Sequence, residues 1–463
     1  MNHPHWRTVL LDLWPRDRVH VGPEMAKAYA RLAEAYPNTR LFGYESGARS
    51  GTWVVPQAWE VGRARLVGPD GTIIADRKDH PLHVFAYSPP FTGTVSRAEL
   101  ERHLLSDPTR PHAIPFHFRN QYRHWAPEWG FCLPHRVHEA LSDGQYRVEI
   151  ETELKPGRME MVEQVHAGEQ ASSLLFVGHF DHPAMCNDGL VGCLAGHEAL
   201  TRLAGRRTRL TYRMLSTVEI IGSVFYAEHE AQRNGVREAL FVSASGARAP
   251  LAYQFSSSGR AFVDRAVTHL LSYFDPGAPI KPFRTLVGND EVAFDVGGVG
   301  IPCGSIARFP FAEYHTSDDT PDAVNDRNFE QVVTLLLHLI DICENNAHLT
   351  RRFAGLPCLS SPTLDLYLSP PTMSGIVQDV NAVAKRLMER LPDEMARAAA
   401  LASGVRFFDL MNLLPTMAEG DHTTLDLAER AGVPFAVAHA YTDMWVEKGL
   451  LIKEWVNPFP ERQ

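Results

Sequence analysis

The sequence predicts an α/β protein whose core is a three-layer α/β/α sandwich. Apolar strand-like runs alternate with helix-like segments from about residue 172 to residue 349, as expected of a mostly parallel sheet with helices on both faces. Short alternating runs broken by Pro, Gly and Asp-Gly pairs precede this region, and a helix-rich stretch follows it. We therefore expect an α/β core at residues 1–42 and 158–355, an inserted β-rich domain at 43–157, and a winged-helix-like domain at 372–463.

Composition excludes several classes of protein. The 463 residues suffice for two to four domains, and 44% hydrophobic with 22% charged residues is ordinary for a globular chain. A net charge of −10 gives no general attraction to nucleic acid or to an acidic membrane. The N-terminus lacks the pattern of a signal peptide, and no apolar run approaches the ~18–20 residues that cross a bilayer. The six cysteines have no paired spacing, so we expect free thiols in a cytoplasmic protein without a membrane partner.

The first elements are a helix and a set of short strands. Residues 22–36, GPEMAKAYARLAEAY, begin with a proline near the first turn and carry apolar residues at helical spacing. From Gly43 to Gly157 the runs TWVVP, ARLVG, TIIAD and YRVEIETEL are separated by turn residues, which predicts the β-rich insertion. Residues 124–135, HWAPEWGFCLPH, concentrate aromatic side chains, for which we expect packing rather than ligand binding.

The core region then alternates strand and helix patterns. LLFVG (residues 174–178) is typical of a buried parallel strand, and the helix pattern GCLAGHEALTRLAG follows it. The later strand patterns are TYRMLST, EALFVSASG, PLAYQFS and the segment around IPCGSIARF, and the later helix patterns are IIGSVFYAEHEAQRNG, AFVDRAVTHLLSYF and FEQVVTLLLHLIDICENNAHL.

The C-terminal region has the pattern of a helix-turn-helix with a β wing. Two short helix patterns meet at Gly432-Val433-Pro434, and the second, residues 435–448, precedes the strand-like LLIKEW. This second helix carries Asp443 and Glu447 against Lys448 and has no Arg. Because phosphate contacts need Lys and Arg, nucleic acid binding is not expected. We expect a packing or dimerisation module, through which the chain would form a homo-oligomer.

Candidate metal ligands follow the first core strand. The run LLFVG ends in His179, Asp181, His182 and Asp188, four metal-ligating side chains within ten residues. In open α/β sheets, ligands bind beyond the carboxyl ends of the strands. A purely structural role, in which these residues cap the next helix or pair with one another, would explain a single such residue more easily than four together.

Three later segments carry similar side chains after short apolar runs. Glu219 follows a strand-like segment, Asp290 and Glu291 follow a glycine turn, and His315 lies in a polar loop ahead of Asp318 and Asp319. Each could therefore lie at the same edge of the sheet. A zinc site needs neutral imidazoles and carboxylates from different segments, with one position open for water.

Such a site also needs carboxylates behind its imidazoles to fix their tautomers. His179 with Asp181 has the spacing of such a pair, and so does His315 with Asp318 or Asp319.

Four ordered motifs and their flanking domains resemble a known family. His-x-Asp after a strand, Asn-Asp-Gly before a helix, Glu followed by Gly-Ser, and Tyr-His-Thr-Ser-x-Asp near the end resemble the zinc aminopeptidases, which include glutaminyl cyclases as relatives. The chain resembles more closely a bacterial aminopeptidase-like family of unassigned function, through HPAMCND, IIGS, GNDE and EYHTS. That family also has an inserted β domain ending in WGFCL and a C-terminal winged helix, so the resemblance spans nearly the whole chain. It implies a zinc-exopeptidase-like core.

The resemblance implies roles for single residues. His179 matches the first zinc ligand, Asp181 its orienting carboxylate, and Asp188 the carboxylate that can bridge two metals. Glu219 matches one of a Glu pair in which one member is the general base and the other a ligand. His315 matches the last zinc ligand.

Two departures from the pattern favour one zinc ion over two. Val218 precedes Glu219, so one Glu cannot fill both the ligand and the base roles. The next ligand of the aminopeptidases, an Asp after a following strand, falls near FVSASG, which has no carboxylate. His182 could then be a ligand in place of His179.

The expected function is a zinc-dependent, aminopeptidase-like hydrolase that cleaves an amide bond beside a free amino group in a small molecule or short peptide. Zinc would polarise the carbonyl and lower the pKa of its water toward ~7, and Glu219 would be the general base. Asp290, Glu291 and Tyr314 could hold the substrate amine or the tetrahedral intermediate, or could make ordinary loop contacts. Two alternatives remain: a zinc enzyme for acyl transfer or cyclisation in small-metabolite biosynthesis, and a non-enzymatic ligand-sensing protein with a degenerate site.

Overall fold

The structure, a computed structural model, describes residues 3–369 and 382–459. The chain divides into two compact units. The first runs to Gly259 and resumes at Lys281–Val333, and the second comprises Arg260–Ile280 and the chain from Thr334 onward. Every predicted metal ligand lies in the first unit. No helix among the described residues is both long and apolar enough to span a membrane.

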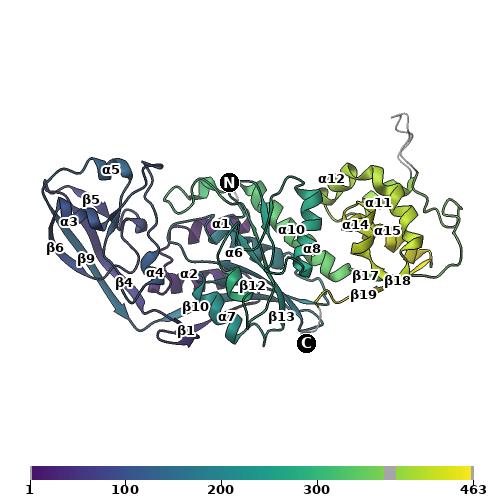
Figure 1. The fold of residues 1–463 in the computed structure, drawn as a ribbon, viewed down its shortest axis with the longest axis horizontal. Helices are drawn as coiled ribbons and strands as arrows, with labels where there is room; N and C mark the ends of the chain where they lie inside the picture. Colours follow the sequence, from purple (N-terminus) through teal and green to yellow (C-terminus); the bar gives the residue numbers. More distant parts are fainter. Residues whose placement is uncertain (1–2, 370–381, 460–463) are drawn as a thin grey trace. The chain divides into compact units, whose positions relative to one another are not determined.

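A mixed eight-stranded sheet forms the centre of the first unit (Figure 1). Its four central strands are parallel, as the sequence predicts, because β11 pairs with β12 and β13, and β13 pairs with β16. Antiparallel neighbours flank them, since β10 pairs with β12, β1 with β10, and β14 with β16. In spatial order the strands are β1 (Thr39–Glu45), β10 (Arg158–His166), β12 (Thr211–Thr217), β11 (Ser173–His179), β13 (Val236–Ser243), β16 (Cys303–Ala307), β14 (Ala252–Gln254) and β15 (Ile280–Lys281).

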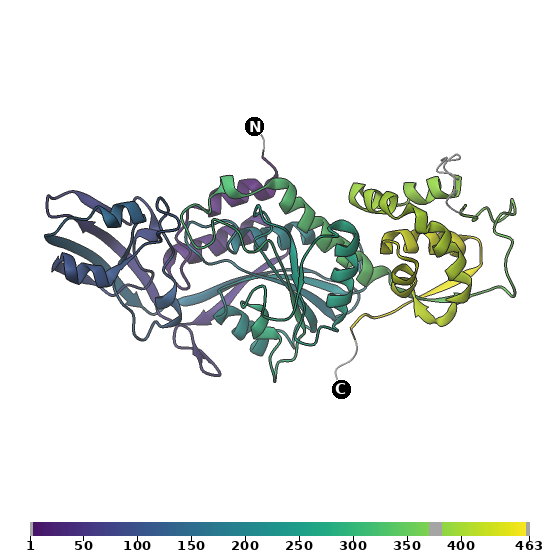
Figure 2. The same ribbon diagram turned by 45° about the horizontal axis from the view of Figure 1, so that its top comes forward.

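Helices cover both faces of this sheet, which gives the expected three layers. Leu175 and Val177 of β11 pack in one hydrophobic cluster with Tyr226 of α7 and Phe294 of α9. The opposite face lies against α6, because an added Cβ on Gly178 would be 3.1 Å from the sulfur of Cys193. Helices α1 and α2 join α6 in that layer (Figure 2). The helices are α1 (His5–Leu13), α2 (Pro23–Ala35), α6 (Leu190–Thr201), α7 (Ile221–His229) and α9 (Glu291–Phe294).

The stretch between β1 and β10 folds as a second sheet within the first unit. Strands in the order β5-β4-β9-β6 form it, and they enclose a cluster of their own that includes Leu66, Phe131 and Val148. The β-rich insertion was expected at residues 43–157. Its strands are β2 (Arg49–Ser50), β3 (Trp53–Val54), β4 (Ala58–Val67), β5 (Ile73–Asp76), β6 (Phe91–Ser96), β7 (Leu104–Leu105), β8 (Phe131–Cys132) and β9 (Gln145–Lys155), and its helices are α3 (Arg97–Leu100), α4 (Arg119–Tyr122) and α5 (His135–Glu139).

The second unit combines helices with a three-stranded antiparallel sheet of order β18-β17-β19. The expected start of the C-terminal domain, residue 372, lies outside the described residues. The helix expected at 329–349 ends at Asn345, and residues 347–351 form strand β17 instead. Both β17 and helix α8 lie in the range expected for the core but belong to this unit, in which β17 pairs with β18 and β19. The elements are α8 (Phe262–Phe274), the end of α10 (Asp326–Asn345), β17 (Ala347–Arg351), α11 (Ala382–Glu389), α12 (Glu394–Ala402), α13 (Phe407–Leu413), β18 (Glu419–Thr423), α14 (Thr424–Ala431), α15 (Phe435–Glu447) and β19 (Leu451–Trp455).

Candidate metal centre

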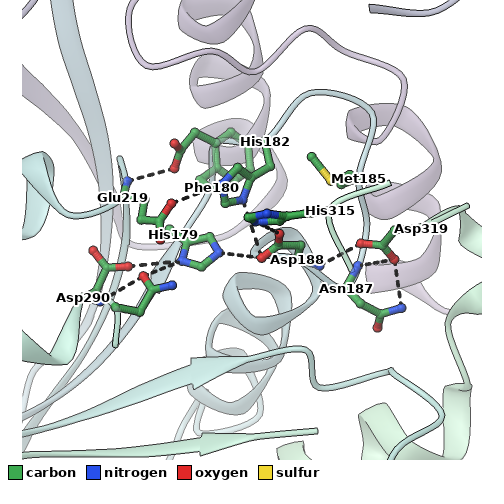
Figure 3. Close-up of polar contacts among 12 residues, drawn as sticks. His179, Phe180, His182, Met185, Asn187, Asp188, Glu219, Asp290, His315 and Asp319 are labelled. Atoms are coloured by element: carbon green, nitrogen blue, oxygen red, sulfur yellow. Dashed lines mark hydrogen bonds and ion pairs between the residues drawn. The ribbon is translucent and has the colours of Figure 1, made fainter. Parts of the chain in front are cut away.

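The predicted ligands come together at the carboxyl ends of the parallel strands. His179 is the last residue of β11, Glu219 lies two residues beyond β12, and Asp188 lies two residues before α6. His315 lies in the loop that follows β16. Parallel strands point their carboxyl ends to one edge of the sheet, so segments far apart in sequence meet there. Figure 3 shows these side chains in one cluster.

The carboxylate of Asp188 is the centre of the cluster. Its Oδ1 lies 3.2 Å from Nε2 of His179 and 3.6 Å from Nδ1 of His182. Its Oδ2 lies 3.1 Å from Nε2 of His315. Asp188 and the first two imidazoles are almost fully buried, whereas the side chain of His315 is 22% exposed. Three imidazole nitrogens from two segments therefore face one carboxylate.

Asn289 and Asp290 orient the ring of His179. Its Nδ1 lies 3.2 Å from Oδ1 of Asn289 and 3.2 Å from Oδ2 of Asp290 (Figure 3). The other oxygen of Asp290 accepts a hydrogen bond of 2.7 Å from Ser223. Because Nδ1 is engaged, Nε2 is left to face Asp188. Asp290 thus contacts the ring rather than open space, and this contact differs from the substrate role considered for it.

Asp181 makes a different contact from the one expected of it. Its Oδ2 lies 3.1 Å from Nε2 of His20, and its Oδ1 accepts the backbone N–H of Glu219 at 2.8 Å. Strand β11 ends at His179 and the backbone turns there, so Asp181 does not lie behind that ring. Among the described residues, its structural role is to fix the backbone at Glu219.

Glu219 contacts two rings through one oxygen. Its Oε2 lies 3.2 Å from Nε2 of His182 and accepts a hydrogen bond of 2.5 Å from the hydroxyl of Tyr122. Among the described residues, Oε1 has no hydrogen-bond partner, and the side chain is 14% exposed. The ring of His182 therefore bridges Glu219 and Asp188, one nitrogen to each.

Asp319 holds the turn that carries Asp188. It accepts the backbone N–H groups of Cys186, Asn187 and Asp188 at 3.1, 2.9 and 2.8 Å (Figure 3). The expected partnership of Asp319 or Asp318 with His315 is therefore absent: Asp318 pairs with Arg110 instead. Three convergent N–H donors fix the backbone from which the central carboxylate projects.

A buried arginine holds the preceding loop. The guanidinium of Arg18 donates to the carbonyl oxygens of Phe180, His182 and Met185 at 2.7–2.8 Å. His182 has φ of +86° and His315 φ of +55°. Left-handed backbone is costly for residues other than glycine and is concentrated at functional sites. The Arg18 contacts hold His182 in this conformation, and the backbone N–H of Phe116 donates to the carbonyl oxygen of His315 at 2.8 Å.

The buried charges shift one another's pKa. Burial lowers the pKa of His179, but its hydrogen bonds with Asp188 and Asp290 outweigh this and hold the pKa well above its ordinary value. For His182, burial is likewise outweighed, chiefly by Asp188, and the pKa rises to about 9. Burial raises the pKa of Asp188, but His182 and His315 hold it well below its ordinary value. Protons on the imidazoles thus compensate the carboxylate, which is the charge a bound cation would supply instead.

The donor set fits a metal ion. Nδ1 of His182 is buried without a hydrogen-bond partner, and Oδ2 of Asp188 is buried with only the ion-pair contact to His315 at 3.1 Å, an arrangement that calls for an explanation in a native structure. Ligand atoms of His179, His182 and Asp188 all lie within 4.8 Å of one another, as do those of Asp181, His182 and Glu219. Imidazole nitrogens and carboxylate oxygens are ligands that zinc accepts.

A cavity of about 320 Å³ opens beside the cluster. Asp188 and Glu219 form part of its wall, and Tyr314, whose ring stacks on His315 at 3.8 Å, forms another part. Glu291 is fully buried and accepts the backbone N–H of Asn289 at 2.9 Å. It is therefore a loop-holding residue, whereas Tyr314 lines the cavity.

Sequence reasoning missed Tyr122, His20, Arg18 and Asn289. Tyr122 lies in the stretch expected to be the β-rich insertion, 97 residues before the glutamate it contacts. His20 and Arg18 precede the first strand, and nothing in their local sequence marks them. Asn289 could have been found, because it adjoins Asp290 in the GNDE motif.

Comparison with known proteins agrees with this architecture. A Clostridium acetobutylicum protein, named for polysaccharide biosynthesis and an aminopeptidase-like domain, is 28% identical over 338 residues, which are 72% of this chain and 76% of that protein. A crystal structure from the same organism, named as a peptidase, matches 97% of this chain and 96% of its own with a TM-score of 0.78 and 24% identity. The zinc aminopeptidase of Bacillus subtilis matches 73% of this chain and 93% of its own with a TM-score of 0.54 and 12% identity.

These likenesses show an aminopeptidase-like domain with the fold of the zinc aminopeptidases. Residues 7–346 match the family described as a domain of unknown function, DUF4910. This match takes in the eight-stranded and four-stranded sheets of the first unit and every residue of the candidate centre. The chain therefore belongs to the DUF4910 family.

Proposed function

We propose that the first unit binds one zinc ion at Asp188 and hydrolyses an amide bond beside a free amino group in a small molecule or short peptide. The observation that carries the proposal is the convergence of three imidazole nitrogens on the Asp188 carboxylate, at the wall of a cavity that Glu219 also lines. Imidazoles that can release their protons to a metal ion, grouped around a carboxylate beside a cavity, are typical of a metal site that admits substrate.

The zinc ligands would be Asp188, either His179 or His182, and His315, which leaves the fourth position open for water. The first two histidines offer ligand atoms grouped with Asp188 within 4.8 Å, and His315 offers a nitrogen 3.1 Å from Oδ2 of Asp188. Asp290 behind His179, and Glu219 behind His182, supply the outer carboxylates that orient ligating imidazoles. One cluster centred on one carboxylate favours a single ion.

Glu219 is the general base in this proposal. When bound, zinc supplies Lewis acidity that polarises the substrate carbonyl and lowers the pKa of water toward ~7. Tyr122 and His182 hold Oε2 of Glu219, while Oε1 remains available toward the cavity. Glu219 takes a proton from the attacking water and passes it to the leaving amine, a role worth ~10²–10⁴-fold in rate.

The fold neighbours support this reaction class. The Bacillus subtilis neighbour is a zinc aminopeptidase, and the Clostridium acetobutylicum relative is named for an aminopeptidase-like domain. Fold alone does not define function, so the residues around Asp188 carry the argument and the neighbours agree with it.

The decisive variant is Glu219→Gln in the full-length chain. Zinc-loaded and chelator-treated protein should first be compared on a panel of aminoacyl amides and dipeptides, and only the loaded protein should hydrolyse any of them. Glu219→Gln should retain zinc and lose ~10²–10⁴-fold in turnover. Glu34→Gln is the matched control, because the Glu34 side chain is 71% exposed and its ion pair is on α2.

Other outcomes separate the roles. If Glu219→Gln loses zinc and turnover together, the residue is a ligand and not the base. If it keeps full zinc and full turnover, Glu219 has no part in the mechanism. If zinc-loaded wild type hydrolyses nothing on the panel, the proposed hydrolase function is wrong.

A further inference from the structure

Arg284 is a cation without a partner in the cavity beside the metal centre. All residues lining that cavity belong to the described part of the chain, and Arg284 is the only Arg, Lys or His among them. Asp188 and Glu219 line the same cavity. Within the described chain, Arg284 makes no hydrogen bond or ion pair.

The position of the guanidinium follows from its neighbour. An added Cβ on Gly288 would lie 3.8 Å from Nη2 and 3.9 Å from Nε of Arg284, so the guanidinium lies over Gly288. The next residue, Asn289, contacts the ring of His179 at 3.2 Å. The guanidinium therefore lies over the loop that leads to Asn289, and Arg284 is also exposed to solvent.

The loop that carries Arg284 is built rigidly. Gln254 is fully buried, and its Oε1 accepts the consecutive backbone N–H groups of Thr285, Leu286 and Val287 at 3.0, 2.8 and 3.1 Å. The amide nitrogen of Gln254 in turn donates to Glu291 at 3.3 Å. A pre-organised binding group loses less entropy when a ligand arrives.

The backbone of Arg284 is strained, as is typical of residues at ligand-binding sites. Its φ is +58°, a conformation that glycine or asparagine adopts more easily than arginine. Residues held in such conformations cluster at active sites and ligand clamps. A ligand in the cavity would give this exposed and strained arginine a partner.

The rest of the cavity limits the ligand. Phe309, Phe311 and Tyr314 form an aromatic wall, with ring centroids 5.1–6.4 Å apart. One planar guanidinium suits one planar carboxylate, which it can bind through two parallel hydrogen bonds. A volume of about 320 Å³ fits a molecule of dipeptide size rather than a long polymer.

We propose that Arg284 binds a carboxylate of the substrate, which makes the preferred substrate a small amide that carries a free carboxylate, of dipeptide or acylated amino-acid type. Only the hydrolysis experiment below rests on the proposed hydrolase function, because the binding experiment needs no turnover. It adds a specificity-determining residue that the metal centre does not require.

The test compares substrates that differ only in this charge. Leucyl-glycine and leucyl-glycinamide, with further aminoacyl pairs of the same design, are assayed with the zinc-loaded full-length chain. Wild type should favour the carboxylate member by about 10-fold or more in kcat/KM, the usual effect of a hydrogen bond between charged groups. Arg284→Met should abolish this preference and leave the carboxamide rate within about twofold of wild type. Arg284→Lys should retain part of it, because lysine keeps the charge without the planar fork.

The matched control is Arg207→Met, since the Arg207 side chain is 88% exposed, pairs with Glu169 and is absent from the cavity. It should keep the full preference. An unchanged preference in Arg284→Met would overturn the inference while leaving the hydrolase function standing.

A binding experiment tests the contact between Arg284 and a carboxylate without any hydrolysis. L-leucine and L-leucinamide are titrated by calorimetry into wild type and Arg284→Met. Tighter binding of L-leucine than of L-leucinamide in wild type, lost in Arg284→Met, supports the carboxylate contact even if no amide is hydrolysed. Equal binding of the two probes by wild type overturns it.

Discussion

At the residue scale, Asp188 is the residue on which the site depends. Its two carboxylate oxygens face three imidazoles, and three N–H donors to Asp319 fix the backbone beneath it. A carboxylate buried this deeply is costly unless cations or hydrogen bonds compensate it. The imidazole protons compensate it without metal, and zinc would do so when bound.

Asp188→Asn should therefore weaken zinc binding by about 100-fold or more, since even loss of an outer partner of a ligand costs about 10–100-fold. A competition titration against a chromophoric chelator measures this. Asp326→Asn, in which the changed side chain is 58% exposed, is the control and should bind zinc like wild type. Wild-type zinc affinity in Asp188→Asn, with the fold intact by circular dichroism, would contradict the placement of the ligand.

The sequence indicates which residues lie at this site better than it indicates which side chains they contact. His179, Asp188, Glu219 and His315 follow apolar runs, and the parallel strands carry them to one edge. The pairing of Asp181 with His179 failed as an expectation, because the strand ends at His179 and residues two apart then no longer share a face. Side-chain partners across a turn depend on backbone torsions that composition does not encode.

At the element scale, the junction between β11 and α6 depends on Gly189. Its φ is +94°, and an added Cβ would lie 2.4 Å from Cδ2 of His179 and 2.5 Å from its carbonyl oxygen. The missing side chain therefore lets the ring of His179 approach the start of α6.

Gly189→Ala should displace His179 and lower zinc affinity, in addition to a strain of about 1–2 kcal/mol from the positive φ. Gly205→Ala is the matched control, because its φ is +79° and nothing lies within 4 Å of an added Cβ. Chemical denaturation and zinc titration of both variants separate strain from collision. Similar zinc affinity in the two variants would show that the contact with His179 has no consequence.

Helix α12 offers a test in the second unit. Asp393 caps it by accepting the backbone N–H of Ala396 at 2.8 Å, and it lies 2.8 Å from Nε2 of His338. Burial raises the pKa of Asp393, but the hydrogen bond with His338 and the cap outweigh this and lower it.

A lowered folded pKa means that this stabilisation is present above the unfolded pKa of about 3.9 and is lost as pH falls through the folded pKa. Asp393→Asn should flatten the loss of unfolding free energy below about pH 4, and Asp393→Ala should cost about 1 kcal/mol at neutral pH through loss of the cap. Urea unfolding followed across pH measures both. Asp421→Asn is the control, as the Asp421 side chain is 70% exposed, and an Asp393→Asn curve parallel to wild type would refute the assignment.

Strongly periodic elements were predictable and short ones were not. The helix expected at 22–36 is α2, and that expected at 435–448 is α15. The four-residue α9 was not expected, because one turn gives no periodic signal and its ends are set by contacts of Glu291 with the preceding loop.

At the scale of the whole molecule, the α/β core could be predicted and the boundaries of its parts could not. Alternating strand and helix patterns define the sheet, since each reflects local burial. The division at residue 333, within α10, leaves no trace in the sequence, because the helix continues through it. Likewise β17 joins the second unit because it pairs with strands about 70–105 residues later in the chain. The local sequence pattern of a strand does not indicate which distant strand it pairs with.

One zinc ion, held by one cluster in the first unit, is the central prediction for this chain. Elemental analysis of the purified full-length protein, after equilibration with zinc and removal of free metal, measures this most directly. The predicted result is one zinc per chain, held by the residues around Asp188. No retained zinc would contradict the metal centre itself, and two ions per chain would contradict the single cluster on which the mechanism rests.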